Sequence, residues 1–254
     1  MRQTPLFTNI QTGEAVYDDA KASYKGIGIK TGIYLLIAIS VAATIYFALP
    51  NIITTGNLPV FYTIMFIGLI VGFITAIVGR VSYRAAKYCG VIYSLSEGLF
   101  LGAISYVAQD WLNYLDFKVP VVAIALGSTL LIFGAMLVLF MTGVTRHGTI
   151  MRRIMIALFV GLIAILPLMI IAYFFVTDFK TYLGIMIAVE AFLLLYGAIT
   201  LTFNFSEAQA VVDSGCSKRD EWSVALGITI SLVYIYIEII RLIILIASYA
   251  GRNK

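Results

Sequence analysis

Charge is scarce in this chain. Asp, Glu, Lys and Arg make up 12% of its 254 residues, while hydrophobic residues make up 61%. Soluble proteins carry about a quarter charged residues, so this composition excludes a soluble globular domain. The longest polar interval, residues 204–223, is too short to form a domain outside a membrane. The sequence therefore predicts an all-α, polytopic membrane protein.

Histidine is also scarce. His147 is the only histidine, so several histidines cannot meet at one metal ion, and a serine or cysteine nucleophile has no buried histidine base. The last apolar run contains no lysine, which excludes a retinal Schiff base there. We therefore expect no enzymatic activity and no cofactor.

Long apolar runs dominate the rest of the chain, and each is close to the roughly 20 residues that a helix needs to cross the hydrocarbon core. They predict seven transmembrane helices in one domain over residues 28–254, after a cytoplasmic tail over residues 1–27. The tail carries charged residues before any long apolar run, so we expect no removable signal peptide. The runs are Ile29–Leu49, Val60–Gly79, Tyr88–Ala108, Val119–Gly143, Ile154–Val176, Tyr182–Phe203 and Val224–Ala247.

Basic residues are unevenly distributed between the two sides of these runs. Of the 17 Lys and Arg residues, twelve lie in the tail and alternate loops on one side, and four lie on the other. The positive-inside rule places the richer side and the N-terminus in the cytoplasm, and the C-terminus outside. This distribution accounts for the basic net charge without a nucleic-acid partner. Cys89 and Cys216 fall on the cytoplasmic side, so we expect no structural disulfide.

Three glutamates, Glu97, Glu190 and Glu238, interrupt separate apolar runs, and Arg241 is the only basic residue within those runs. An ionisable group at membrane depth costs at least a few kcal/mol and marks a functional site by default. The three carboxyl groups are at depths that let them meet near the middle of the membrane. They could line an ion pathway, form a proton-sensitive latch or satisfy one another. Facing lipid as neutral acids is the remaining alternative.

Glu238 and Arg241 are three residues apart, so they share one helix face and can pair, which would keep Glu238 ionised. Alternatively, Arg241 extends to the outer interface and leaves Glu238 to another partner. Carboxylates, backbone carbonyls and water suit hard cations. We therefore expect weak, transient cation contacts at Glu97 and Glu238.

Five segments of the chain carry a resemblance to a known family. They are Thr4-Pro5-Leu6-Phe7, Tyr17-Asp18-Asp19 to Lys30-Thr31-Gly32, Ser96-Glu97-Gly98-Leu99-Phe100-Leu101-Gly102-Ala103, Lys218-Arg219-Asp220-Glu221-Trp222 and Tyr236-Ile237-Glu238-Ile239-Ile240-Arg241-Leu242. These segments resemble a bacterial branch of the Bax inhibitor-like membrane family, whose members carry the transmembrane BAX inhibitor motif. The resemblance runs almost end to end, and its last segment is the most specific.

The resemblance implies a seven-helix fold whose last helix is surrounded by the other six. It also implies a pH-sensitive calcium leak in some members, and in others binding of a membrane-embedded protease or a role in stress survival. The family's proton sensor is a pair of acids on the sixth and seventh helices, and Glu238 matches the acid on the seventh.

On the sixth helix the corresponding stretch reads Asn204-Phe205-Ser206-Glu207. Asn204 and Ser206 cannot titrate, so another acid would have to replace the missing member of the pair. The candidates are Glu207, Asp213 and Glu97.

The leading prediction is a pH-sensitive cation leak channel of the bacterial inner membrane, with calcium as the expected ion, gated by protonation around Glu238. Its expected partners are membrane lipid and calcium or other cations, and we expect no nucleic acid. The alternative is a non-transporting regulator that binds another membrane protein, such as a membrane-anchored protease.

Overall fold

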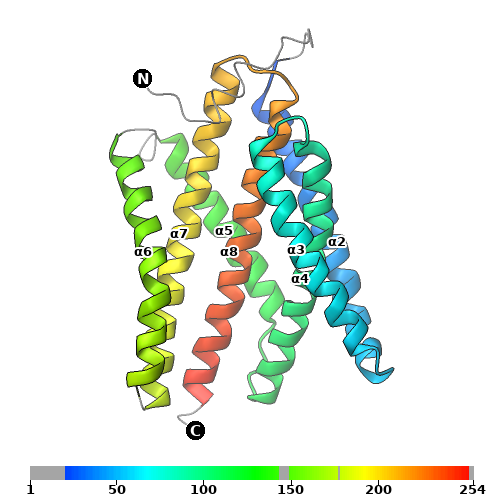
Figure 1. Ribbon diagram of the computed structural model, residues 1–254, viewed down its shortest axis with the longest axis vertical. Coiled ribbons are helices and arrows are strands. Elements are labelled where there is room, and N and C mark those ends of the chain that lie inside the picture. The colour runs from blue at the N-terminus through cyan, green and yellow to red at the C-terminus, as the bar shows by residue number, and fades with distance from the viewer. Residues whose placement is uncertain (1–20, 143–148, 177, 252–254) are drawn as a thin grey trace. The chain divides into compact units, whose positions relative to one another are not determined.

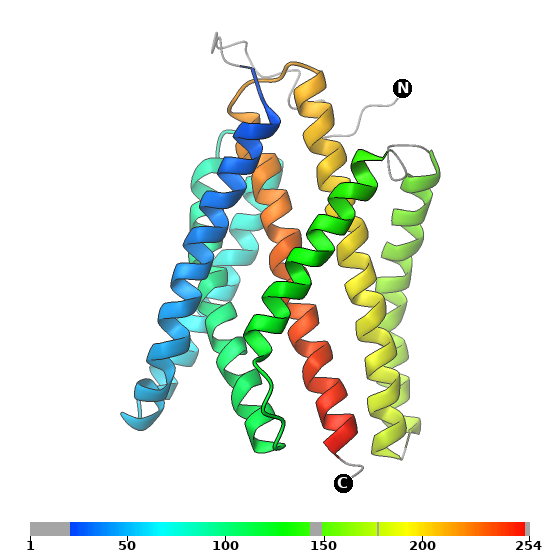
Figure 2. The same cartoon turned by 180° about the vertical axis from the view of Figure 1, so that it is seen from behind.

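The computed structural model describes residues 21–142, 149–176 and 178–251 (Figures 1 and 2). Every regular element in these ranges is an α-helix, so the chain is an all-α, polytopic membrane protein. Some predictions fall outside the described residues, namely those on Thr4–Phe7, Tyr17–Asp19 and His147.

Seven helices occupy the described ranges, and each overlaps one predicted run. Six of them are long and apolar enough to cross a membrane. The remaining helix, α6, has 27 residues, which rise about 40 Å and also suffice for a crossing. The helices are α2 (Tyr24–Thr54), α3 (Leu58–Val81), α4 (Ala86–Tyr114), α5 (Val121–Met141), α6 (Thr149–Phe175), α7 (Phe179–Asp213) and α8 (Asp220–Gly251).

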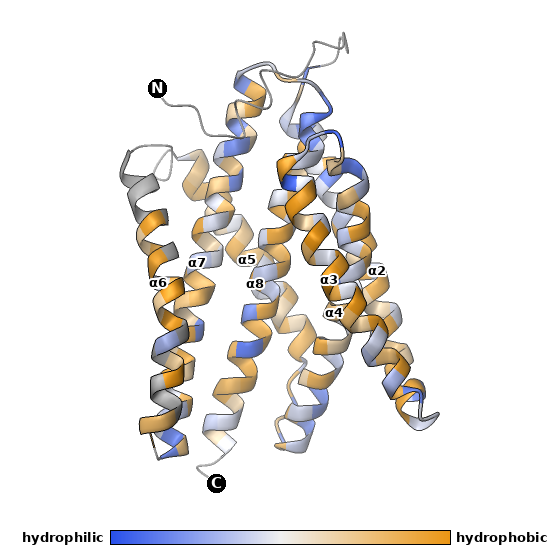
Figure 3. Ribbon diagram, in the orientation of Figure 1, coloured by the Kyte–Doolittle hydropathy of each residue, from blue (hydrophilic) through white to orange (hydrophobic). Residues whose placement is uncertain are grey.

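Helix α2 starts earlier than the apolar run that predicts it. Ser23 caps it in an extended conformation, and its hydroxyl accepts a hydrogen bond from the Gly26 amide at 3.0 Å. Helix α5 starts later than its run, because Pro120 occupies the capping position and the helix begins at Val121. Hydrophobic residues cover most of the length of the helices, and isolated hydrophilic positions interrupt α8 (Figure 3).

Helix α7 extends well beyond the predicted end of the sixth span. The apolar run stops at Phe203, and the polar residues after it suggested a loop, but α7 continues to Asp213. Helical structure persists because Asn204 and Glu207 both find polar partners inside the fold. The connection to α8 is therefore short, and Gly215 turns the chain there with a φ of 64°.

The described chain divides into two compact units. Unit 1 consists of residues 1–103 and 204–230, and unit 2 of residues 104–203 and 231–254. Helices α4, α7 and α8 contribute to both units. Half of the most apolar stretch of α4 and of α8 is buried, against at most 22% in the other candidate spans. These two helices therefore have an interior character.

Contacts of α8 agree with the interior position expected for the last helix. In unit 1 it contacts α2, α3 and α7 through Lys30–Glu221, Arg80–Ser223 and Asn204–Gly227. In unit 2 it contacts α4 and α7 through Ser105–Tyr236 and Glu190–Arg241.

Glycines let α4 pack directly on the backbone of α2 in unit 1. A Cβ atom at Gly98 would lie 2.7 Å from the Ala38 carbonyl oxygen, and one at Gly102 would lie 2.5 Å from the Ala42 carbonyl oxygen. Real Cβ atoms do not come that close to another heavy atom, so only glycine fits at either position. The two glycines are one turn apart, a spacing typical of close helix packing in membranes.

Candidate functional site

Unit 2 contains a buried cluster of two acids and one arginine. Helix α7 supplies Glu190, and helix α8 supplies Glu238 and Arg241. The side chains of Glu190 and Glu238 are 4% and 3% exposed, whereas that of Arg241 is 49% exposed. The guanidinium group therefore lies at the edge of the cluster while both carboxyl groups are inside it.

Arg241 bridges the two acids. Its Nε lies 3.3 Å from Glu190 Oε1, and one of its terminal nitrogens lies 3.4 Å from Glu238 Oε2. The contact with Glu190 is ionic only, since Glu190 Oε1 accepts no hydrogen bond within the described chain. Both carboxyl groups therefore face the same guanidinium group.

Tyr234, one turn before Glu238 on α8, also joins α8 to α7. Its hydroxyl donates to the Leu193 carbonyl oxygen on α7 at 3.3 Å. Gly197 makes room for this tyrosine, because a Cβ there would lie 2.7 Å from the Tyr234 ring. Helices α7 and α8 are thus joined by polar contacts over successive turns.

The charge count of this cluster determines what it can do. Two ionised carboxylates and one guanidinium leave one negative charge uncompensated, and an unpaired buried charge costs several kcal/mol. The cluster can remove that cost by binding a proton or by attracting a cation. It is therefore chemically suited to respond to pH.

Of the two alternatives considered for Arg241, the structure shows the pair with Glu238, and the extension of Arg241 to the outer interface stays a prediction. The depths of Glu190 and Glu238 allowed the two acids to meet, but the ion pair between Glu190 and Arg241 was not predicted, because Glu190 is far away in the sequence. No local pattern shows which face of α7 meets α8. The available signal was the depth of Glu190 within its apolar run.

A second polar cluster lies in unit 1 around Arg80 of α3. Arg80 donates to Glu207 Oε2 at 2.8 Å, to Asn204 Oδ1 at 3.4 Å and to the Ser223 carbonyl oxygen at 3.3 Å. The Asn204 amide donates to the Gly227 carbonyl oxygen at 3.0 Å. A side chain at position 227 would collide with Arg80, so glycine is required there. Glu207 thus has a basic partner of its own.

Asn204, Ser206 and Glu207 belong to unit 1, and Glu190 and Glu238 belong to unit 2. Within unit 2, Glu190 is the acid of α7 that shares Arg241 with Glu238. The role of Glu207, Asp213 or Glu97 as the family's sixth-helix acid stays a prediction. Ser206 is buried, and Asp213 is exposed at the end of α7.

Glu97 belongs to unit 1. It is half-buried on α4 in unit 1, with Oε1 3.6 Å from where a Cβ at Gly72 of α3 would be. Among the described residues, no three His, Cys, Asp or Glu side chains form a group that could hold a metal ion. A weak cation contact at Glu97 or Glu238 stays a prediction.

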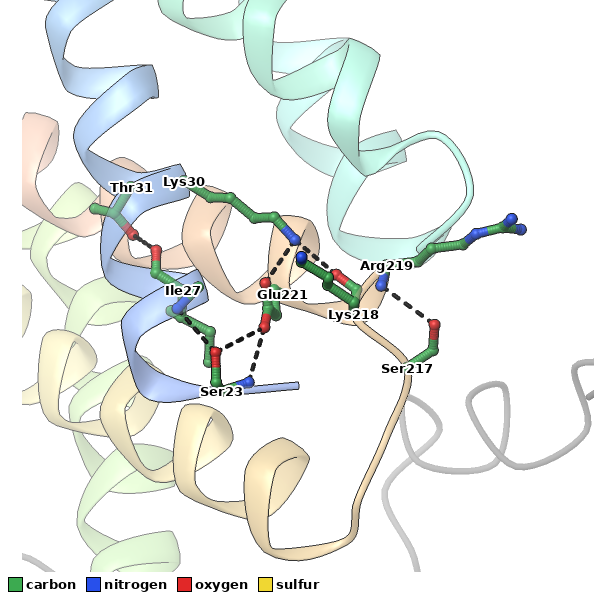
Figure 4. A network of polar contacts seen from close by, with 9 residues as sticks. Ser23, Ile27, Lys30, Thr31, Ser217, Lys218, Arg219 and Glu221 are labelled. Atoms are coloured by element: carbon green, nitrogen blue, oxygen red, sulfur yellow. Dashed lines mark hydrogen bonds and ion pairs between the residues drawn. The ribbon is translucent and has the colours of Figure 1, made fainter. Parts of the chain in front are cut away.

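A third cluster, which sequence reasoning missed, joins the start of α2 to the start of α8 (Figure 4). Glu221 accepts hydrogen bonds from the Ser23 amide at 2.7 Å and from Lys30 Nζ at 2.6 Å. Lys30 also donates to the Lys218 carbonyl oxygen at 2.6 Å. The Glu221 side chain is fully buried. Lys30 at the start of an apolar run was the signal that could have indicated a buried partner.

Comparisons with known proteins give one match. The family model described as Bax inhibitor 1 like matches residues 4–248. This range includes all three polar clusters and all but the last turn of α8. Searches of curated proteins and of solved structures gave no match.

Proposed function

Because the chain belongs to the Bax inhibitor 1 like family, we propose that it is a pH-sensitive cation leak of the bacterial inner membrane, with calcium as the ion. The observation that carries the proposal is the sharing of one arginine by two buried acids, Glu190 and Glu238. The proposal assigns no chemical reaction to the chain.

Closure rests on the ionised cluster. The contact that joins α8 to α7 in unit 2 is the ion pair between Arg241 and Glu190. Ionised Glu238, on the same helix as Arg241, holds the guanidinium group in place for this pair. Breaking a buried ion pair costs several kcal/mol, which is enough to keep one helix arrangement dominant. Protonation of Glu238 removes the partner charge and weakens this clamp.

Opening follows from proton uptake. As pH falls, the pair gains a proton and the flux of cations rises, with an apparent midpoint that belongs to the pair and not to one residue. The oxygens of Glu190 and Glu238, together with water, provide the hard ligands that calcium prefers. So few carboxylate oxygens suit brief contact during passage better than tight binding.

Flux into liposomes tests the proposal. The purified protein is reconstituted with a calcium indicator inside the vesicles, and calcium uptake is followed from alkaline to acidic pH. We expect uptake to rise as pH falls, and protein-free vesicles to show no such rise. Correctly inserted protein that passes no calcium at any pH would contradict the proposal.

A second candidate function is that of a non-transporting regulator bound to another membrane protein. Two glycines on α5 favour it, because a Cβ at Gly127 or Gly134 would meet no atom within 4 Å. Small residues on an open helix surface let a helix of another protein approach closely. The same liposome assay separates the two functions, since a regulator alone carries no calcium.

A further inference from the structure

At the end of unit 1 where α2 and α8 begin, acidic and basic side chains differ in how far they are buried. Asp220 and Glu221 are buried, at 5% and 0% exposure. Most basic residues there are exposed, and the exceptions are Lys30, which is buried, and Arg80, which is half-buried and paired with Glu207. In the described part of unit 1, Asp213 is the one exposed acid. The exposed basic residues are Lys21, Lys25, Arg84, Lys87, Lys218 and Arg219, and we call them the basic surface.

The buried network explains why this surface stays positive. The charge of Glu221 is neutralised by the buried side chain of Lys30, and the Ser23 amide donates a hydrogen bond to the same carboxylate. Its carboxylate is therefore not available to the exposed lysines and arginines. Arg219 points away from Glu221 and from the network (Figure 4).

Backbone and ring contacts fix the basic surface in place. Lys21 pairs with Ser217 in an isolated β-bridge, and the Ala22 amide donates to the Cys216 carbonyl oxygen at 2.8 Å. These contacts hold the segment before α2 beside the segment before α8. Lys87 Nζ, at the start of α4, lies 5.7 Å from the centre of the Trp222 ring, on which Lys30 also sits at 4.8 Å. Three helix starts thus share one cluster.

Exposed aromatic residues accompany the basic ones. Tyr24 and Tyr88 are 53% and 69% exposed, and they stand in the first turns of α2 and α4. Tyrosine is enriched at the level of lipid headgroups, where its ring contacts hydrocarbon and its hydroxyl contacts water. The basic surface therefore lies where a bilayer presents its headgroups.

We propose that the basic surface binds the headgroups of anionic phospholipids in the surrounding bilayer. Its charges are complementary to phosphate, and the two acids at the start of α8, Asp220 and Glu221, are buried. The positive-inside rule places this surface in the cytoplasmic leaflet, where anionic lipids act on juxtamembrane basic residues. The tyrosines favour a lipid over a soluble acidic protein. This inference does not depend on ion flux.

Counting bound lipids by native mass spectrometry tests the proposal. Detergent-purified protein is titrated with phosphatidylglycerol, and separately with phosphatidylcholine of the same acyl chains. The test variant is Lys218→Gln/Arg219→Gln. It removes two charges but keeps the Lys218 carbonyl and the Arg219 amide, which are the groups that the network uses. We expect phosphatidylglycerol affinity to fall about five-fold for each removed charge, with phosphatidylcholine affinity unchanged.

A matched control is available in unit 2. Lys118→Gln/Lys180→Gln removes the same charge from exposed positions, and it is expected to leave phosphatidylglycerol binding unchanged. An equal loss in both double variants, or equal wild-type affinity for the two lipids, overturns the proposal. Displacement of the lipid by inorganic phosphate alone would assign the site to a free anion and also overturns it. Lys87→Gln on α4 repeats the test if the first variant fails to fold.

Discussion

At the scale of single residues, the sharing of one arginine by two acids makes Glu238→Gln the most informative change. Glutamine has nearly the shape of a protonated glutamate but cannot ionise, so it cannot attract Arg241 as a carboxylate does. We expect a protein that leaks calcium at all pH values, with little remaining pH dependence. Calcium uptake into liposomes measures this. Asp178→Asn, an acid-to-amide change at an exposed position of the same unit, is the control, and an unchanged pH profile in Glu238→Gln would remove Glu238 from the gate.

Arg241→Ala removes the positive charge of the same cluster. The guanidinium group lies within 3.4 Å of both acids and favours their ionised forms. Without it, a proton binds at higher pH, so we expect the rise in flux to begin at higher pH than in the wild type. Arg241→Lys keeps the charge but not the two-nitrogen geometry, and it should give an intermediate response. A midpoint that moves to lower pH would contradict this assignment.

The sequence alone predicted part of this cluster. The spacing of Glu238 and Arg241 predicts a pair because residues three apart share one face of a helix. Glu190 could be recognised as a buried acid, but its contact with Glu238 depends on how α7 rotates against α8. That rotation follows from side-chain packing, such as the fit of Tyr234 against Gly197, which no local pattern encodes. The Lys30–Glu221 pair was missed for the same reason.

At the scale of helices, the packing of α4 on α2 predicts a difference between two glycines. A Cβ at Gly102 would collide with the Ala42 backbone, whereas one at Gly127 of α5 would meet nothing within 4 Å. We expect Gly102→Ala to lower stability by about 1–3 kcal/mol, as overpacking does. Gly127→Ala should not destabilise, because alanine favours helix more than glycine does. Thermal unfolding in detergent compares the two, and equal stability of both variants would contradict the close contact.

Helix ends were less predictable than helix positions. Apolar length located all the helices, but it placed the end of the sixth span at Phe203, although α7 continues to Asp213. Hydropathy registers polar residues and not their partners. Asn204 and Glu207 remain helical inside unit 1 because Arg80 and Gly227 satisfy them.

The short connection between α7 and α8 carries a thiol whose reactivity reports on its packing. Burial, with a smaller contribution from Asp220, raises the pKa of Cys216 above its usual range. Less thiolate is then present at neutral pH, and the thiolate is the reactive form. We expect slow alkylation by iodoacetamide that accelerates only at pH above the ordinary thiol range. Cys89→Ala removes the second thiol, and the rate profile of an ordinary exposed thiol would contradict the packing of this connection.

At the scale of the whole molecule, composition and apolar length were sufficient for the fold class, and the match over residues 4–248 confirms the family. The fold class follows from a general requirement, because each span must satisfy its own backbone hydrogen bonds and so must be a helix. The partition of contacts between unit 1 and unit 2 could not be predicted, because it depends on which faces of α4, α7 and α8 meet their neighbours.

Orientation in the membrane is the remaining prediction, and it rests on twelve Lys and Arg residues on one side of the spans against four on the other. With seven crossings, an N-terminus in the cytoplasm requires a C-terminus outside. Alkaline phosphatase fused after Lys254 should therefore be active, because this reporter folds only after export, and green fluorescent protein at the same position should stay dark. The same reporters inserted after Ser214, between α7 and α8, should give the opposite result. A C-terminal fusion that fluoresces and lacks phosphatase activity would exclude seven crossings with this orientation, and an active phosphatase after Ser214 would place the basic surface away from the cytoplasmic leaflet.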